Sequence, residues 1–157
     1  MTKWRRLNGQ ELEKSLLTSV EDAIIKEQKE GHRLKVCIGT DSEVYGKKVE
    51  FASVIVFLRE GKGAFMYISN MSEIKKMSLK ERMIKEVARS IDIAYRLCGI
   101  FEKYNIELEV HADINSDPNF KSNVALKEAM GYILGMGFKF RAKPDAFASS
   151  SCADRFC

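Results

Sequence analysis

The sequence predicts an α/β protein built on a five-stranded mixed sheet, with its elements in the order βββαβαβ behind an extra N-terminal helix. Three short, apolar and β-branched segments, 34–41, 51–58 and 64–69, follow one another with glycine-containing turns between them. This is the pattern of an antiparallel meander. Two stretches of helical periodicity then alternate with two further strand-like segments. Such an alternation indicates parallel crossovers, so the sheet should be mixed and flanked by helices.

Length and composition favour one compact unit. The chain has 157 residues, of which 45% are hydrophobic and 31% are charged, values that are typical of a globular domain. We therefore expect a single domain over 1–157, with a helical extension at 1–32 and the core at 33–157. No apolar run approaches the roughly 18 residues of a membrane span, and the N-terminus does not resemble a signal peptide. We expect a cytoplasmic protein without a membrane partner.

The helix boundaries are predicted from capping signals. Asn8 and Glu11 have the spacing of a capping box, and leucine, valine and isoleucine then recur on one face, so we predict a helix over 9–30. Ser78 and Glu81 repeat the capping-box spacing ahead of a second apolar stripe. We therefore expect a long second helix after Ser78.

The last part of the core is expected to alternate between strand and helix. The second helix should end near Tyr104, before a strand over 106–112. A third helix is expected to start at Asp117 or at Ser122 and to end at nearby glycines, and a strand over 138–142 follows. A last short helix is expected just after that strand.

Charge and cysteine content exclude few function classes. The net charge of +4 permits a nucleic-acid partner without requiring one. The four cysteines are mostly far apart and the chain has only two histidines, so closely spaced zinc-binding pairs are absent from the sequence. We expect the cysteines to be reduced thiols that are either buried or have no functional role.

Four acidic residues lie where a sheet of this order would bring its segments together. Asp41 ends the first strand, Asp113 ends the fourth, Glu86 lies in the helix between them, and Asp145 follows the last strand. The first and fourth strands should be neighbours, which would bring Asp41 and Asp113 close to each other. Clustered carboxylates repel one another, and a fold that gathers them usually holds a divalent cation.

Each of these residues also has a simpler interpretation. Asp41, Asp113 and Asp145 are residue types that turns and helix caps commonly use. Glu81 is the alternative to Glu86, although capping with Ser78 already explains Glu81. His111 lies two residues before Asp113, on the same strand face, where it could shuttle protons or act only as a hydrogen-bonded sheet histidine.

The order of elements and the acidic positions together resemble the ribonuclease H-like superfamily. Thr40-Asp41-Ser42 is similar to its first catalytic aspartate, Glu86 to its helical glutamate, and Asp113 to the aspartate of its fourth strand. Asp145-Ala146-Phe147-Ala148 is similar to the start of the last helix in the RuvC and YqgF branch. Over nearly its whole length the chain resembles the YkuK-type family of bacteria, which are predicted ribonuclease H-like proteins.

This resemblance implies a nuclease. The expected activity is divalent-metal-dependent hydrolysis of phosphodiester bonds in RNA or DNA. Asp41, Glu86, Asp113 and Asp145 would be both catalytic and metal-binding, and would hold two Mg²⁺ or Mn²⁺ ions about 4 Å apart. Basic residues around the cleft could contact the phosphate backbone, or could be ordinary solvated surface. In the later part of the chain these are Lys121, Lys139, Arg141 and Lys143.

The chain departs from the ribonuclease H pattern in ways that leave alternatives open. It has an extra N-terminal helix and no basic helical insertion between its crossover helices, so specificity for a hybrid duplex is not expected. The short segment after Asp145 would leave the cleft wall incomplete unless a second subunit fills it, which makes a homodimer possible. A non-catalytic nucleic-acid or protein-binding module on the same scaffold is the alternative function. Kinship with actin-like ATPases is disfavoured, because the further nucleotide-binding motifs are missing.

Overall fold

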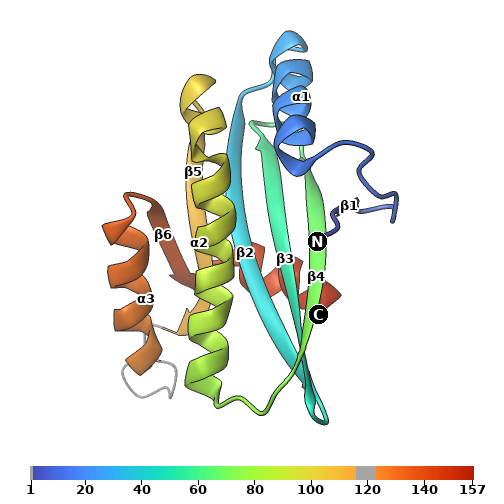
Figure 1. Cartoon of the computed structure of the whole chain (residues 1–157). Helices are drawn as coiled ribbons and strands as arrows, with labels where there is room; N and C mark the ends of the chain where they lie inside the picture. Colours follow the sequence, from blue (N-terminus) through green and yellow to red (C-terminus); the bar gives the residue numbers. More distant parts are fainter. Residues whose placement is uncertain (1, 116–122) are drawn as a thin grey trace.

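The computed structural model describes residues 2–115 and 123–157 as a twisted sheet with helices over it (Figure 1). Six strands lie in the order β1-β4-β3-β2-β5-β6. Their bounds are Arg5–Arg6 for β1, Leu34–Tyr45 for β2, Lys48–Arg59 for β3, Ala64–Ile74 for β4, Glu107–Asn115 for β5 and Lys139–Lys143 for β6. Strands β2, β3 and β4 form the antiparallel meander, whereas β5 pairs in parallel with β2 and β6 pairs in parallel with β5.

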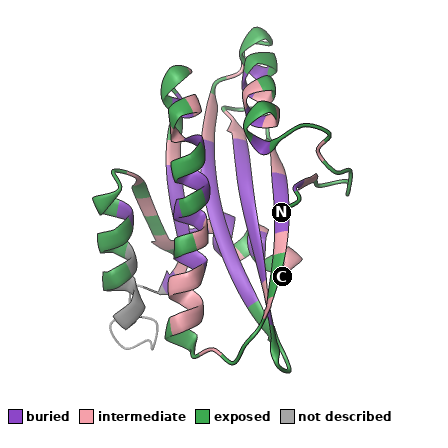
Figure 2. Ribbon diagram, in the orientation of Figure 1, coloured by how far each residue is buried: buried purple, intermediate pink, exposed green. Residues whose placement is uncertain are grey.

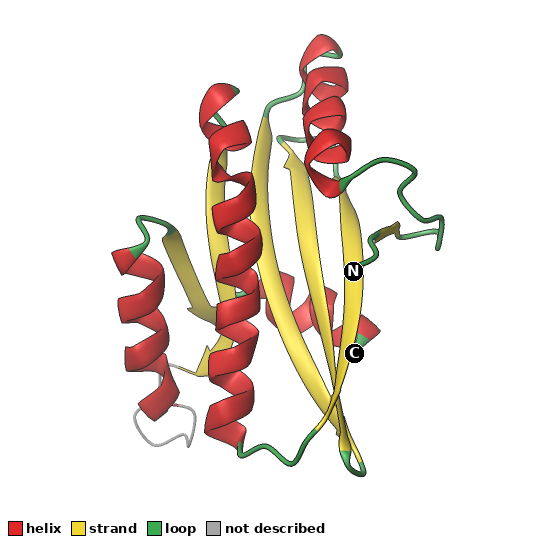
Figure 3. Ribbon diagram, in the orientation of Figure 1, coloured by secondary structure: helices red, strands yellow, loops and turns green. Residues whose placement is uncertain are grey.

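Three α-helices cover one face of this sheet and the C-terminal turns cover the other (Figures 1 and 3). The helices are α1 (Leu16–Lys29), α2 (Leu79–Lys103) and α3 (Asn123–Gly135). The C-terminal turns are a π-helical segment, η1 (Ala148–Ala153), and a 3₁₀ turn, η2 (Asp154–Phe156). Within the described ranges, no helix is both long enough and apolar enough to cross a membrane.

The predicted fold class is confirmed, with one more strand than expected. The additional strand β1 pairs with β4 at the sheet edge, where Arg5 lies opposite Ile68. The predicted start of the first helix is wrong. Asn8 accepts a hydrogen bond from the Gln10 amide in a turn, and the helix begins only at Leu16, capped by Ser15. A local Asx turn therefore outcompetes the helix that Asn8 was expected to start.

The start of the second helix agrees with the sequence pattern. The Ser78 hydroxyl accepts from the Glu81 amide, as an N-cap does, and α2 runs from Leu79. The predicted start of the third helix, at Asp117 or Ser122, lies outside the described residues. The last short helix is present, as η1 followed by η2.

Each face of the sheet has its own apolar cluster, and the central strands are buried along most of their length (Figure 2). On the helical face, Ile38 of β2 and Val110 of β5 pack with α1 and α2. On the opposite face, Cys37 of β2 packs against Ala148 and Ala153 of η1. Side chains alternate between the two faces along a strand. Odd-numbered positions of β2 and β5 therefore face the C-terminal turns.

Candidate metal centre

Asp41 and Asp113 lie side by side where the parallel pairing of β2 with β5 ends, although β2 continues past the predicted strand end at Asp41 to Tyr45. The last register pair between β2 and β5 is Thr40 with Ala112, and each aspartate is the next residue on its strand. Both side chains therefore face the side covered by η1. Asp41 is 6% exposed, and its Oδ1 accepts from the Ser42 amide at 2.9 Å. The expected adjacency of these two aspartates is present in the structure.

A third carboxylate, Asp154, reaches Asp41 from the C-terminal turns. Asp154 is the first residue of η2. Carboxylate oxygens of Asp41 and Asp154 and the Cys157 sulfur all lie within 4.8 Å of one another. The turn that carries Asp154 can approach because Gly39 has no side chain: a Cβ there would lie 2.5 Å from the Ser149 amide nitrogen. Close packing of η1 on β2 thus brings Asp154 to the end of the strand.

Glu86 reaches the same strand end from the helical face. It lies on α2, is 6% exposed, and accepts a short hydrogen bond from the Ser42 hydroxyl. Arg82, one turn earlier, donates to the Ser42 hydroxyl at 3.1 Å and to the Ser42 carbonyl at 2.8 Å. Ser42 therefore connects the helical glutamate and its arginine to the strand that carries Asp41.

Asp41 and Glu86, the most buried carboxyls of the acidic cluster, are held in their protonated form more strongly than usual. Burial, the adjacent Asp154 carboxyl and the charge of Asp113 raise the pKa of Asp41 to about 8. Burial and the charges of Asp41 and Asp113 likewise raise the pKa of Glu86 to about 8, although the bond from Ser42 opposes this rise. Removing negative charge from water without a counter-cation produces such shifts. A divalent cation would reverse them.

Asp113 has polar partners of its own. Its Oδ1 accepts from the Ser150 hydroxyl at 3.0 Å and lies 2.9 Å from the Lys143 ammonium. Ser150 belongs to η1, and Lys143 is the last residue of β6. The Asp113 side chain is 20% exposed, so the group stands at the open margin of the cluster.

Two of the residues considered from the sequence lie apart from these contacts. Asp145 is exposed at a bend after β6, and its amide donates to the Ala142 carbonyl. Glu81 forms a 2.9 Å surface ion pair with Lys75. The geometry therefore favours Asp154 over Asp145, and Glu86 over Glu81, as members of the acidic cluster.

His111 is buried on the η1 side of β5, with both ring nitrogens engaged. Its Nδ1 accepts from the Ala148 amide at 3.2 Å, so Nε2 carries the proton that it donates to Glu109 Oε1 at 3.1 Å. Its ring also packs edge-on against Phe147. In this arrangement neither nitrogen is free to shuttle a proton, and His111 instead ties η1 to the sheet.

Two other groups of ionisable side chains are less suited to a metal. Cys37, Glu109 and His111 have ligand atoms close together, but burial raises the pKa of the Cys37 thiol to about 12. Glu109 is already neutralised by Lys35 at 2.7 Å. Because His111 accepts at Nδ1, its Nε2 is protonated and has no lone pair for a metal. The second group consists of Glu27, Glu30 and His32. Its buried member, Glu27, is already paired with Arg59 and His32.

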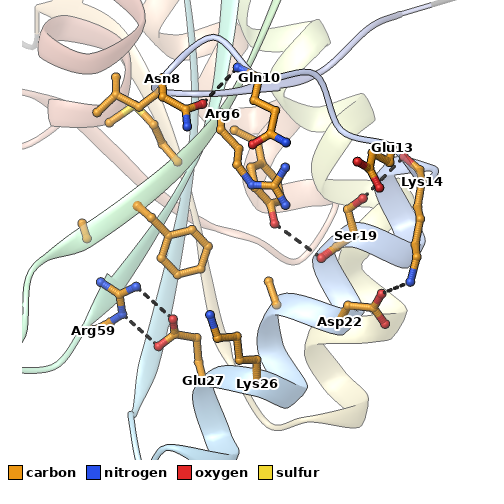
Figure 4. A pocket seen from close by; sticks show the side chains of 16 residues that line it. Arg6, Asn8, Gln10, Glu13, Lys14, Ser19, Asp22, Lys26, Glu27 and Arg59 are labelled. Atoms are coloured by element: carbon orange, nitrogen blue, oxygen red, sulfur yellow. Dashed lines mark hydrogen bonds and ion pairs between the residues drawn. The ribbon is translucent and has the colours of Figure 1, made fainter.

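A wide groove of about 980 Å³ lies between the N-terminal segment, α1 and β4, and shares no lining residue with the acidic cluster. Figure 4 shows two ion pairs among the charged residues that line it. Arg59 forms two bonds to Glu27, and Lys14 bonds to Asp22 at 3.0 Å. Glu13, which also lines the groove, forms no ion pair within the described residues, but it is exposed and belongs to no group of neighbouring metal-ligand side chains there.

Comparison with known proteins shows the family to which the chain belongs. Residues 16–157 match the family model described as ribonuclease H-like. The chain is also 30% identical over 133 residues to the uncharacterized protein YkuK of Bacillus subtilis (strain 168), an alignment that covers 76% of each chain. Since the family model spans most of its length, the chain belongs to the ribonuclease H-like family.

Proposed function

We propose that this protein is a divalent-metal-dependent hydrolase of phosphodiester bonds in RNA or DNA, with Asp41, Glu86, Asp113 and Asp154 around its metal centre. One observation carries the proposal. Carboxylates from four separate elements lie around one part of β2: oxygens of Asp41 and Asp154 are within 4.8 Å of each other, Asp113 is next to Asp41 on β5, and Glu86 reaches Ser42 from the helical face. Two of them, Asp41 and Glu86, are buried and have pKa values raised to about 8. Perturbed carboxyls of this kind concentrate at functional sites.

The donor set fits a hard cation. The ligands on offer are carboxylate oxygens, with the Ser42 hydroxyl beside them, and oxygen donors favour Mg²⁺ or Mn²⁺ over softer metals. Among the described residues, the Cys157 sulfur lies close to the Asp41 and Asp154 oxygens. Burial and the surrounding carboxylates raise its pKa to about 12, so it stays a neutral thiol. Mg²⁺ is therefore the preferred ion, with Mn²⁺ as a substitute.

The protein groups would orient the reactants. When bound, the cation would stabilise charge on the phosphate oxygens and favour deprotonation of a nearby water. Asp41 and Asp154 would accept hydrogen bonds from that water and align it opposite the P–O bond that breaks. One P–O bond forms from water, and the leaving oxygen takes up a proton. Ser42, fixed by Arg82, would keep Glu86 in place.

The test is a cleavage assay with a matched pair of variants. A panel of hybrid duplex, double-stranded DNA, junction and single-stranded RNA is incubated with Mg²⁺ or Mn²⁺, with EDTA as the blank. Glu86→Gln should lower the cleavage rate by about 100-fold, as loss of a charge-stabilising group does. Glu81→Gln, on the same helix but in a surface ion pair, should stay within about twofold.

Two outcomes of this assay would contradict the proposal. Metal-dependent binding of the panel without cleavage by the wild-type protein would favour a binding module on this scaffold. Equal effects of the two substitutions would remove Glu86 from the centre.

A further inference from the structure

Lys143 is the cation of the described residues that lies against the acidic cluster itself. Its ammonium is 2.9 Å from Asp113 Oδ1. Beyond Asp113, the charges of Asp41 and Asp154 also act on the Lys143 ammonium. The side chain is 43% exposed, so its head can reach solvent or a ligand without rearrangement of the core.

The position is fixed by the sheet. Lys143 ends β6 opposite Asn115, after an irregularity in the β5–β6 register that follows His111. Asp113 lies within that irregular stretch of β5. The end of β6 therefore places Lys143 beside Asp113, the same carboxylate that the Ser150 hydroxyl of η1 contacts.

The charges around the cluster favour a single metal ion. Fully ionised, the four carboxylates of the proposed centre carry four negative charges. One Mg²⁺, Lys143 and Arg82 together carry four positive charges, and Arg82 acts on Glu86 directly. A second Mg²⁺ would leave an excess of positive charge before any phosphate binds, and would have to enter beside an ammonium on Asp113.

We propose that Lys143 occupies the place of a second metal ion, so that the centre works with one divalent cation and the Lys143 ammonium donates to an oxygen of the scissile phosphate. This rests on the proposed function, of which it specifies the metal count and one further catalytic residue. An ammonium supplies positive charge and three donors at the point where negative charge develops.

The test counts bound ions as well as activity. Mn²⁺ binding to the full chain is followed by electron paramagnetic resonance for the wild type, Lys143→Met and Lys143→Arg. Lys139→Met is the matched control, because Lys139 is on the same strand and also pairs with a carboxylate, Glu107. The wild type, Lys143→Arg and the control should bind one Mn²⁺ in the acidic cluster. Lys143→Met should bind two.

Cleavage gives the second readout. At Mg²⁺ concentrations that fill only the first site, Lys143→Met should lose about 100-fold in rate, whereas Lys139→Met should stay within about twofold. Circular dichroism confirms that each variant is folded, and Lys143→Gln replaces the methionine variant if it is not.

The ion count and the cleavage rate separate failure of the Lys143 proposal from failure of the proposed function. If the wild type binds two Mn²⁺, or if Lys143→Met binds one ion more tightly without gaining another, Lys143 is only a counter-ion that metal displaces and the proposal is wrong. If the ion count changes as expected but the wild type cleaves nothing, the place of Lys143 stands and the proposed function fails.

Discussion

Two buried carboxylate groups in this protein have opposite electrostatic surroundings. Glu27 on α1 accepts two bonds from Arg59, at 2.8 and 2.9 Å, and one contact from His32 at 2.6 Å. Arg59 above all lowers its pKa to about 2. Asp41 and Glu86 are similarly buried but face other carboxyls, and their pKa values rise to about 8.

The difference separates a structural ion pair from the proposed metal centre. Burying a carboxylate is costly unless a cation or hydrogen bonds compensate. The protein supplies that compensation for Glu27 from its own chain. It supplies much less at Asp41 and Glu86, where Lys143 and Arg82 lie at the margins of the cluster. We interpret the uncompensated group as the one that awaits a divalent cation.

The largest expected effect concerns the members of the acidic cluster. Asp41→Asn should lower metal-dependent cleavage by at least about 1000-fold, because it removes the central ligand. Asp154→Asn should lower it by about 100-fold. Asp145→Asn is the control, since Asp145 is exposed, and should change the rate less than about twofold. A larger loss from Asp145→Asn than from Asp154→Asn would reverse our choice of the fourth carboxylate.

At Glu27, which is paired with Arg59, a substitution is expected to change stability and not cleavage. Glu27→Gln should lower the free energy of unfolding by about 3 kcal/mol, because Arg59 and His32 lose their partner in a buried setting. This corresponds to a drop of about 6–12 °C in melting temperature. Glu30→Gln, whose side chain is 49% exposed and 3.8 Å from His32, should have little effect. Cleavage by folded Glu27→Gln should be unchanged, and loss of activity without loss of stability would contradict the comparison.

The contact between η1 and β2 can be broken at Gly39. Gly39→Ala would place a Cβ 2.5 Å from the Ser149 amide, so η1 must shift and carry Asp154 with it. We expect a loss of about 2 kcal/mol in unfolding free energy together with weaker Mn²⁺ binding. Gly99→Ala, exposed on α2 with open space around it, should instead stabilise by about 0.5–1 kcal/mol. Unchanged Mn²⁺ affinity in Gly39→Ala would show that η1 does not position the centre.

A further expected effect is on the pH dependence of stability without metal. Between about pH 4.5 and 8 the folded state holds protons on Asp41 and Glu86 that the unfolded state releases, so these groups make stability fall as pH rises. Glu27 acts in reverse: its contribution is present above its ordinary pKa and is lost as pH falls toward 2. Urea unfolding in EDTA at pH 5, 6.5 and 8 compares wild type with the Asp41→Asn/Glu86→Gln double variant.

The double variant should lose less stability between pH 5 and 8 than the wild type does. Mg²⁺ added at pH 8 should stabilise the wild type and leave the double variant unaffected. Parallel pH profiles for the two proteins would mean that these carboxyls do not carry the shifted titrations.

The sequence was informative where one local rule acted alone. Asp41 and Asp113 were predictable as neighbours because parallel pairing fixes the strand ends, and the start of α2 followed from the Ser78 cap. The start of α1 was not predictable, because Asn8 can form either a helix cap or a turn. Asp154 was missed because it belongs to no strand or cap pattern. The only signal for it is the run of small residues over 148–153, which allows a turn to pack closely on a strand.

The central claim is that the acidic cluster, rather than the paired group around Glu27, holds a divalent cation. Crystals of the wild-type chain soaked in Mn²⁺ test this directly by anomalous scattering. The account predicts an anomalous peak within about 2.0–2.6 Å of carboxylate oxygens of Asp41 and Asp154, and none beside Glu27. A peak at Glu27, or a cluster without Mn²⁺ at concentrations that support cleavage, would contradict it.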